Sequence, residues 1–476
     1  MEFDLSKRQN YWFNEISRIP RGSRNEKAVS DFVVSFAKEH GLSCKQDHVW
    51  NVIVDKPASP GCEDAPVLMM QAHMDVVCEK NKDTVHDFTK DPLDLYVDEE
   101  GWLHARGTTL GSDDGYGCAY MLAVLEDDSL KHPALQCIFT TMEEIGLLGA
   151  FELKKEDLHG RRLINLDGGG VNNTCVSSAG GARAQITAEI EYEENTDPVW
   201  VLGVRGLQGG HSGGCIHLER GNSNILAARI LKEAQLKGLD IRLVSFTGGL
   251  KFNAIPREAD VVFASSSPYE KLMESFRKSE AEICEELRGS DSFFITVEES
   301  ASDKKIVRSV SDNVLNYLFL MPNGFQHKSM TVKDLTASSL NVGAVVTEDG
   351  KIIMEDLIRS AIASHTDILI EQLQTLGQLL NISVNIHDRY YGWAFREESP
   401  LRSKLESVLN AHGLNMECHA AHGGLECGVF AGMDKEMDII TFGPIATGEH
   451  TPDEKLNLES FDFCYGLLRE LISSCC

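Results

Sequence analysis

The stretch VLMMQAHMDVV, residues 67–77, is an apolar run that ends in polar side chains. Two more runs share this plan, LQCIFTTMEE at 135–144 and RRLINLDGGG at 161–170, and the helical pattern CAYMLAVLED lies between the first two. Such strands, alternating with helices, are typical of a mostly parallel sheet buried on both faces. We therefore predict an α/β domain with helices on both faces of its sheet, in which ligands bind beyond the carboxyl ends of the strands.

Polar residues occur at the positions where this rule places a binding site. His73 and Asp75 end the first run, Glu143 and Glu144 end the second, and Asp167 ends the third. Acidic residues scattered at random would not gather at strand ends in this way. The sequence therefore predicts a site at this edge of the sheet.

A fourth element of the site is predicted in GTTLGSDDGYG, residues 107–117, where two aspartates precede a helix. An Asp at a helix start accepts hydrogen bonds from unpaired backbone N–H groups, but this role requires only one of the two. We expect Asp113 to be a ligand, held by a glycine-rich turn, and Asp114 to cap the helix. The assignment between these neighbours is open at this point.

Composition excludes several classes of partner. The chain has 476 residues, 42% of them hydrophobic, and a net charge of -28, which repels nucleic acid and anionic membranes. No run of eighteen apolar residues occurs and the amino-terminal residues lack a secretory pattern, so we expect a cytoplasmic protein. Most of its 13 cysteines are then expected to be reduced thiols.

The pattern of apolar and polar residues changes after about residue 182. Alternating segments with interspersed helices replace the buried runs, which indicates antiparallel strands with helices on one side, and the first pattern returns near residue 387. We predict a catalytic domain in two parts, 1–182 and 387–476, interrupted by an inserted α+β lid and dimerisation domain at 183–386. No repeat is visible in the sequence.

The candidate ligands form a set suited to divalent metals. Two imidazoles and three carboxylates suit zinc, with manganese or cobalt as alternatives, and five ligands are more than one tetrahedral ion uses. Two ions about 3.5 to 4 Å apart that share one carboxylate would use all five and could hold a hydroxide between them. The predicted ligands are His73, Asp113, Glu144, Asp167 and His450.

The neighbours of these ligands suggest further roles. At the end of a strand the backbone turns, so Glu144 can bind metal while Glu143 faces a bound water as the general base. Asp75, two residues beyond His73, is expected to accept the second ring N–H of that imidazole and fix its tautomer.

Several motifs together resemble the M20 family of dinuclear zinc peptidases, in particular its aminoacyl-histidine dipeptidase branch (Xaa-His dipeptidase, PepD type). The motifs are QAHMDVV, GTTLGSDDGYG, TTMEEIGLLGA, INLDGG, GLQGGHSGG and GEHTP. The resemblance implies that His73 and Asp167 bind one metal, that Glu144 and His450 bind the other, and that Asp113 bridges them. It also implies a cis peptide bond after Asp113.

The resemblance suggests three further residues in the inserted domain. His211, in GLQGGHSGG, is expected to stabilise the oxyanion of the tetrahedral intermediate, often in the site of a neighbouring subunit, so that a homodimer would link assembly to activity. Asn253 and Arg359 are weaker candidates for binding the substrate's backbone and terminal carboxylate.

The predicted function is that of a metal-dependent dipeptidase. A dimetal-bridging hydroxide attacks the scissile carbonyl, Glu143 serves as the general base, and the inserted domain closes over a short peptide. The resemblance implies Xaa-His dipeptides, including β-alanyl-histidine. A tripeptidase or N-acyl amino acid deacylase of the same chemistry, and a noncatalytic metal-binding protein on the same fold, are the alternatives.

Overall fold

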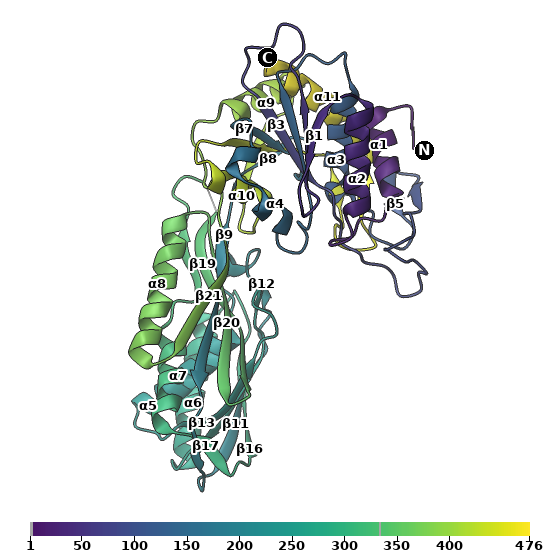
Figure 1. Ribbon diagram of the computed structural model, residues 1–476. Coiled ribbons are helices and arrows are strands. Elements are labelled where there is room, and N and C mark those ends of the chain that lie inside the picture. Colours follow the sequence, from purple (N-terminus) through teal and green to yellow (C-terminus); the bar gives the residue numbers. More distant parts are fainter. Residues whose placement is uncertain (1–2, 333–334) are drawn as a thin grey trace. The chain divides into compact units, whose positions relative to one another are not determined.

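The computed structural model describes residues 3–332 and 335–476, and it divides the chain into two compact units (Figure 1). The first unit consists of Met1–Ser177, Phe395–Ala420 and Leu425–Cys476. The second consists of Ser178–Ala394 and Ala421–Gly424, so it interrupts the first along the chain.

A six-stranded sheet forms the centre of the first unit, in the order β1-β2-β6-β3-β7-β23. Strands β6, β3, β7 and β23 are parallel, whereas β1 and β2 are joined to them by antiparallel pairing. The predicted mostly parallel α/β sheet is therefore confirmed. Its strands are β1 (Ser43–Gln46), β2 (Val52–Lys56), β3 (Leu68–His73), β6 (Leu135–Thr140), β7 (Arg162–Asn165) and β23 (Asp438–Thr441).

Helices cover this sheet and form one core with it. Helix α3 packs against β3 and α1, α2 against β1 and β2, and α9 against β23. Helix α3 is apolar on every side and almost wholly buried, as expected for a helix enclosed by other elements. The helices of the unit are α1 (Arg8–Ser17), α2 (Lys27–Glu39), α3 (Ser112–Glu126), α4 (Leu148–Glu152), η1 (Lys155–Asp157), α9 (Pro400–Ala411), α10 (Glu426–Met433) and α11 (Leu458–Ser474).

Two smaller sheets complete the first unit. A four-stranded sheet has the order β24-β25-β5-β4, and β22 pairs with β8. The four-stranded sheet brings the segment after His450 beside the segment that leads to Asp113, because β25 pairs with β5. The bounds are β4 (Leu95–Val97), β5 (Trp102–Ala105), β8 (Asn173–Ser178), β22 (Glu417–Ala421), β24 (Ala446–Thr447) and β25 (Lys455–Asn457).

The second unit contains a nine-stranded antiparallel sheet, in the order β16-β11-β15-β13-β19-β20-β9-β21, with β18 paired to β19. Burial alternates along β9, and its buried alanines and isoleucine join one core with α5, α7 and α8. Figure 1 shows α8 lying along this sheet. The strands are β9 (Gly180–Glu189), β11 (Val199–Arg205), β13 (Arg242–Gly248), β15 (Ala259–Ala264), β16 (Phe294–Ser300), β18 (Gly324–Lys328), β19 (Thr336–Glu348), β20 (Lys351–Ser360) and β21 (Ser383–Tyr390).

This sheet is built from two halves of equal topology. One half has the chain order β11-α5-β13-β15-α6-β16, and the other has β9-α7-β19-β20-α8-β21. If the four strands of each half are numbered along the chain, they lie in the sheet in the order 4-1-3-2 from the outer edge to the middle. The second strands of the two halves, β13 and β19, pair where the halves join. The structure therefore contains a repeat of topology that the sequence does not display. The remaining elements are β10 (Tyr192–Glu194), β12 (Gly210–His211), η2 (Ile216–Leu218), α5 (Ser223–Leu236), β14 (Ala254–Ile255), α6 (Tyr269–Glu286), β17 (Lys304–Ile306), α7 (Arg308–Leu320) and α8 (Ala363–Leu380).

The predicted boundaries after residues 182 and 386 fall inside strands β9 and β21. The units instead change at residues 177/178 and 394/395. β9 begins with two glycines, and the exposed part of β21 carries polar residues, so neither strand end has the apolar pattern that marks a strand in sequence.

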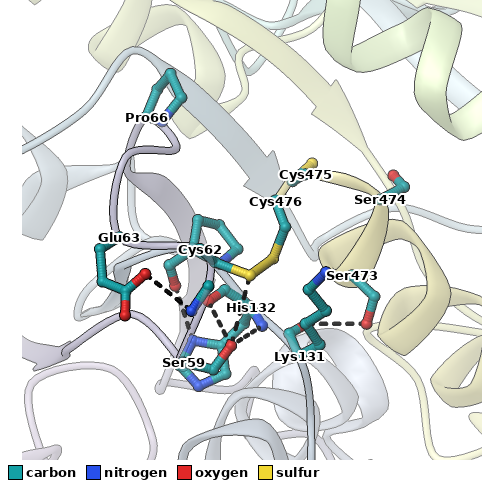
Figure 2. Close-up of a disulfide and its surroundings, with 12 residues drawn as sticks. Ser59, Cys62, Glu63, Pro66, Lys131, His132, Ser473, Ser474, Cys475 and Cys476 are labelled. Carbon is teal, nitrogen blue, oxygen red and sulfur yellow. Dashed lines mark hydrogen bonds between the residues drawn. A yellow bond between two sulfur atoms is a disulfide. The ribbon is translucent and has the colours of Figure 1, made fainter.

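A disulfide between Cys62 and Cys476 ties the last residue of the chain to the loop after β2 (Figure 2). Ser59 donates to Cys62 Sγ and to the backbone oxygen of His132, and Ser473 Oγ donates to the backbone oxygen of Lys131 at 2.9 Å. The other cysteines are free thiols, in accord with the expectation that most are reduced. No helix in residues 3–332 and 335–476 has both the length and the apolar character needed to span a bilayer.

The disulfide predicts a redox-dependent stability. Because a crosslink over 414 residues restricts the unfolded chain, Cys476→Ser should lower stability by about 2 to 4 kcal/mol without reductant. Its melting temperature, measured by differential scanning calorimetry, should then fall by several degrees. Cys44→Ser, which removes a free thiol of the same unit, is the matched control. Equal melting temperatures of wild type and Cys476→Ser in non-reducing buffer would contradict the prediction.

Candidate metal centre

Three adjacent parallel strands bring most of the predicted ligands together. Strand β3 lies between β6 and β7, and all three run in the same direction. His73 is the last residue of β3, Glu143 and Glu144 follow β6, and Asp167 follows β7. The carboxyl ends of three neighbouring strands therefore supply four of the predicted side chains.

The two aspartates at the start of α3 have different surroundings. Asp114 Oδ1 accepts the backbone N–H of Gly117 at 3.1 Å, which is the capping interaction, and Oδ2 accepts that of His73 at 3.3 Å. The peptide bond between Asp113 and Asp114 is cis, which confirms the expectation. Asp113 is left to face the two candidate histidines.

The carboxylate of Asp113 lies between the two imidazoles. Its Oδ1 is 2.9 Å from Nε2 of His73, and its Oδ2 is 3.3 Å from Nε2 of His450. Nε2 of His450 is also 3.0 Å from Oε2 of Glu144. Asp113 is thus common to two groups whose ligand atoms lie within 4.8 Å of one another: His73, Asp113 and Asp167; and Asp113, Glu144 and His450.

Glu143 lies at the edge of this cluster. Its Oε2 is 3.9 Å from Nε2 of His73, and it forms a third close group with His73 and Glu144. Burial raises its pKa well above the normal value, and the negative charge of Asp167 adds to the rise, although His73 opposes it. Glu143 therefore holds a proton readily where no added positive charge is near.

Asp75 contacts the ends of both β3 and β6. Nδ1 of His73 is 3.0 Å from the backbone oxygen of Asp75 and 3.6 Å from its carboxylate, so the main chain is the nearer acceptor. The carboxylate accepts the backbone N–H groups of Glu143 and Glu144, at 3.0 and 3.3 Å, and the hydroxyl of Ser23 at 2.7 Å. Asp75 thus fixes the turn that carries both glutamates.

The charges of the cluster shift its pKa values strongly. Burial alone would lower the pKa of His73, but the hydrogen bond to Asp113 and the nearby carboxylates of Asp75 and Glu143 raise it well above normal. Hydrogen bonds to Asp113 and Glu144 raise the pKa of His450 to about 11. Burial and the charge of Asp113 raise the pKa of Asp167 well above normal. The carboxylates therefore attract any available positive charge.

The residues present fit a pair of divalent cations. Glu144 has a buried carboxylate oxygen, Oε1, with no hydrogen-bond partner among the described residues. Carboxylate and imidazole donors in two groups that share one carboxylate suit two zinc-like ions. Such ions would offset the negative charge that otherwise raises the pKa values of Glu143 and Asp167.

The three other predicted residues lie in the second unit, where they form a separate cluster. The strand of His211 pairs with that of Ala254, and Ser212 N–H donates to the backbone oxygen of Asn253 at 2.9 Å. Nε of Arg359 is 3.4 Å from the hydroxyl of Ser212. His211 lies in the two-stranded sheet of β12 and β14, Asn253 directly precedes β14, and Arg359 lies in β20 of the nine-stranded sheet, so the cluster spans both sheets.

Sequence reasoning missed a fourth residue of this cluster, His422. Its Nε2 is 2.7 Å from the hydroxyl of Ser339, and burial together with Arg359 lowers its pKa to about 3. The two glycines that follow it, in HGGLEC, were the only signal in the sequence.

Two buried glutamates of the first unit were also missed. Glu426 begins α10 and accepts hydrogen bonds from Gln71 and from Thr140 Oγ1, and burial raises its pKa to about 7. Glu454 accepts hydrogen bonds from the segment before Asp113. Neither belongs to a motif of metal ligands, and the partners of Glu454 are mostly main-chain groups.

Comparisons with known proteins agree with this geometry. Residues 69–474 match peptidase family M20/M25/M40. The cytosol non-specific dipeptidase of Escherichia coli is 36% identical over 468 residues, which cover 97% of this chain and 96% of that protein.

Solved structures show the same likeness. The crystal structure of aminoacylhistidine dipeptidase from Vibrio alginolyticus superposes with a TM-score of 0.91 at 35% identity, covering 98% of this chain and 96% of that one. Aminopeptidase PepT from Bacillus cereus shares the fold, with a TM-score of 0.57 at 15% identity and 99% coverage of both chains. Given the match over most of its length, the chain belongs to peptidase family M20/M25/M40.

Proposed function

We propose that this chain is a metal-dependent dipeptidase whose substrates are Xaa-His dipeptides, β-alanyl-histidine included. The observation that carries the proposal is the pair of donor groups that share Asp113, with the half-buried carboxylate of Glu143 beside them. Relatives that align over nearly the whole chain are named a non-specific dipeptidase and an aminoacylhistidine dipeptidase, which supports the substrate class.

The ligands of the two ions follow from these groups. His73 and Asp167 would hold one cation, Glu144 and His450 the other, and Asp113 both; zinc is the ion that this donor set fits best, with manganese and cobalt as alternatives. When bound, the cations polarise the scissile carbonyl and lower the pKa of a water molecule toward 7. Asp75 keeps Nε2 of His73 directed to the metals, since Nδ1 is engaged by its backbone oxygen.

Glu143 is the group that moves the proton. Nearby positive charge lowers its pKa, so in the loaded site its carboxylate is ionised and accepts a proton from the attacking water. It then passes this proton to the leaving amine. Its position is fixed because its own N–H donates to Asp75.

The cluster in the second unit is proposed to bind the peptide. Arg359 is 6% exposed, and its guanidinium donates at 3.4 and 3.5 Å to the hydroxyls of Ser212 and Tyr390. These bonds to neutral groups are long, so we propose that the guanidinium binds the carboxylate of the dipeptide in bidentate fashion. His211 is the proposed donor to the oxyanion, and Asn253 the proposed contact to the peptide backbone. We propose that these groups contact the substrate when the inserted domain closes over it.

A tripeptidase or N-acyl amino acid deacylase would use the same metal chemistry. The structural likeness to a tripeptidase from Staphylococcus aureus, at 16% identity, shows a shared fold only. A dipeptidase is favoured because the relatives at 35% identity or more carry that name. A noncatalytic role is not favoured, since both the donor groups and the candidate base are present.

The cellular location and the assembly are also proposals. A relative named for the cytosol supports a cytoplasmic location. We propose a homodimer through the inserted domain, where a groove beside α7 and α8 exposes the apolar side chains of Leu320, Ile368 and Leu379.

Chelation tests the metal dependence. Hydrolysis of a panel of Xaa-His dipeptides should disappear after treatment with a chelator and return with zinc or manganese. The panel should include tripeptides and N-acetylated amino acids, which we expect to be poor substrates. Activity that survives complete removal of metal would contradict the proposal, and preferred cleavage of an N-acetylated amino acid would favour the deacylase instead.

Glu143→Ala tests the general base. The variant should keep a metal content near normal while kcat falls by about 10² to 10⁴, because only the proton acceptor is removed. Metal content is measured by elemental analysis. Glu156→Ala, at an exposed position of the same unit, is the matched control and should retain wild-type kcat. Full turnover of Glu143→Ala would remove this residue from the mechanism.

Mixing two inactive variants tests whether His211 acts in the metal site of its own chain or in that of a neighbouring subunit. The resemblance implies that His211 acts in the site of a neighbouring subunit, so a mixture of inactive His211→Ala and Glu143→Ala chains should regain activity, at up to about a quarter of the sites. Light scattering checks that the mixed chains form dimers. A mixture that stays inactive although mixed dimers form would contradict this role of His211 in the partner's site.

A further inference from the structure

The segment Leu110–Ser112 leads directly into Asp113 and is enclosed by buried side chains. Gly111 has a φ of 65°, in the left-handed region that favours glycine. A Cβ added there would lie 2.6 Å from Cγ1 of Val76 and 3.0 Å from Nη2 of Arg21. The main chain before Asp113 is therefore held in one path by close contact.

Glu454 binds this segment through its whole carboxylate. It is 2% exposed and accepts the backbone N–H groups of Leu110, Gly111 and Ser112 at 2.7, 2.9 and 2.8 Å, and the hydroxyl of Ser112 at 2.6 Å. Successive backbone N–H groups of this kind make a concave site for an anion, which here is a side chain of the same unit. Glu454 also lies four residues after His450, so one loop carries both a candidate ligand and this carboxylate.

Arg21 binds the same segment from the other side. It is 3% exposed and forms no salt bridge within the described parts of the chain. Its Nη2 donates to the backbone oxygen of Gly111 at 2.7 Å, and its Nη1 donates to that of Met74 at 2.8 Å. Gly111 thus lies between a buried cation at its C=O and a buried anion at its N–H.

Arg21 connects this segment to the end of β3. Met74, whose carbonyl it binds, lies between His73 and Asp75, and the backbone N–H of Val76 donates to the backbone oxygen of Arg21 at 3.1 Å. A single guanidinium therefore spans the two segments that carry His73 and Asp113. Burying a charge without a partner is costly, so each of these groups is held by the carbonyls or N–H groups that it binds.

We propose that Arg21 and Glu454 are positioning residues of the metal centre, which fix the main chain on both sides of Gly111 and so hold Asp113 against His73. The inference rests on the proposed role of Asp113 as the shared ligand. Neither residue touches the metals. Each acts through the backbone that carries a ligand, as outer partners of metal ligands do.

Metal affinity of the full-length protein tests this role without reference to activity. Glu454→Gln keeps the size of the side chain but replaces an acceptor oxygen with an NH₂ donor that faces backbone N–H groups. We expect zinc, measured by competition with a chromophoric chelator, to bind about 10- to 100-fold more weakly at one site at least. Glu459→Gln, the same change at an exposed position five residues later, should bind zinc as wild type does.

A second pair of variants tests the shared action on Gly111. Arg21→Met should also weaken zinc binding, and the double variant with Glu454→Gln should lose less affinity than the product of the two single losses, because both act on one segment. Circular dichroism and melting of the metal-free proteins check the fold. Should Glu454→Gln or Arg21→Met fail to fold, Ser112→Ala replaces them in the test, because it removes one hydrogen bond to Glu454. We then expect Ser112→Ala to lose zinc affinity several-fold.

Asp113→Ala separates failure of this inference from failure of the proposed metal site. If Asp113→Ala loses zinc while folded Glu454→Gln binds it within twofold of Glu459→Gln, Glu454 does not position the site and the proposed function stands. If Asp113→Ala retains two zinc ions, Asp113 is not the shared ligand and both proposals fall.

Discussion

The repulsion between carboxylates crowded at one edge of a parallel sheet is the constraint that governs the first unit. Because β6, β3 and β7 are parallel neighbours, the residues that follow them meet at one edge. Asp113, Asp167, Glu143 and Glu144 come together there, and the close groups that they form among the described residues contain two histidines, His73 and His450. Burial and mutual repulsion raise the pKa values of Glu143 and Asp167, so this arrangement favours any ligand that adds positive charge. A pair of divalent cations satisfies that demand with the donors available.

The same constraint explains the surroundings of the cluster. Crowded carboxylates need a rigid backbone to keep their positions, and this backbone is held by buried charged groups outside the candidate ligand set. Asp75 fixes the turn of Glu143 and Glu144, while Arg21 and Glu454 hold Gly111 from opposite sides. These buried charges bind main-chain N–H and C=O groups, which satisfies them without adding to the charge of the centre.

The sequence predicted some parts of the fold and of the candidate site but not others. The strand ends could be found because apolar runs and the polar residues after them are local patterns, and these residues included His73, Glu144 and Asp167. The edges of the inserted domain could not, since β9 begins with glycines that carry no hydrophobic signal. Glu454 escaped notice for a related reason: its partners are backbone N–H groups, which have the same identity at every position. The ligand roles themselves remain predictions that the geometry supports.

The repeated topology of the second unit determines which segments of the chain form its polar cluster. Pairing of β13 with β19 joins two βαββαβ halves into one sheet, and the cluster lies where loops and strands of both halves meet. His211 comes from one half and Arg359 from the other, and Ser212 links them in a single chain. The geometry between these side chains is then set by contacts within the second unit of one chain. Contacts within one chain are therefore enough to assemble this polar cluster.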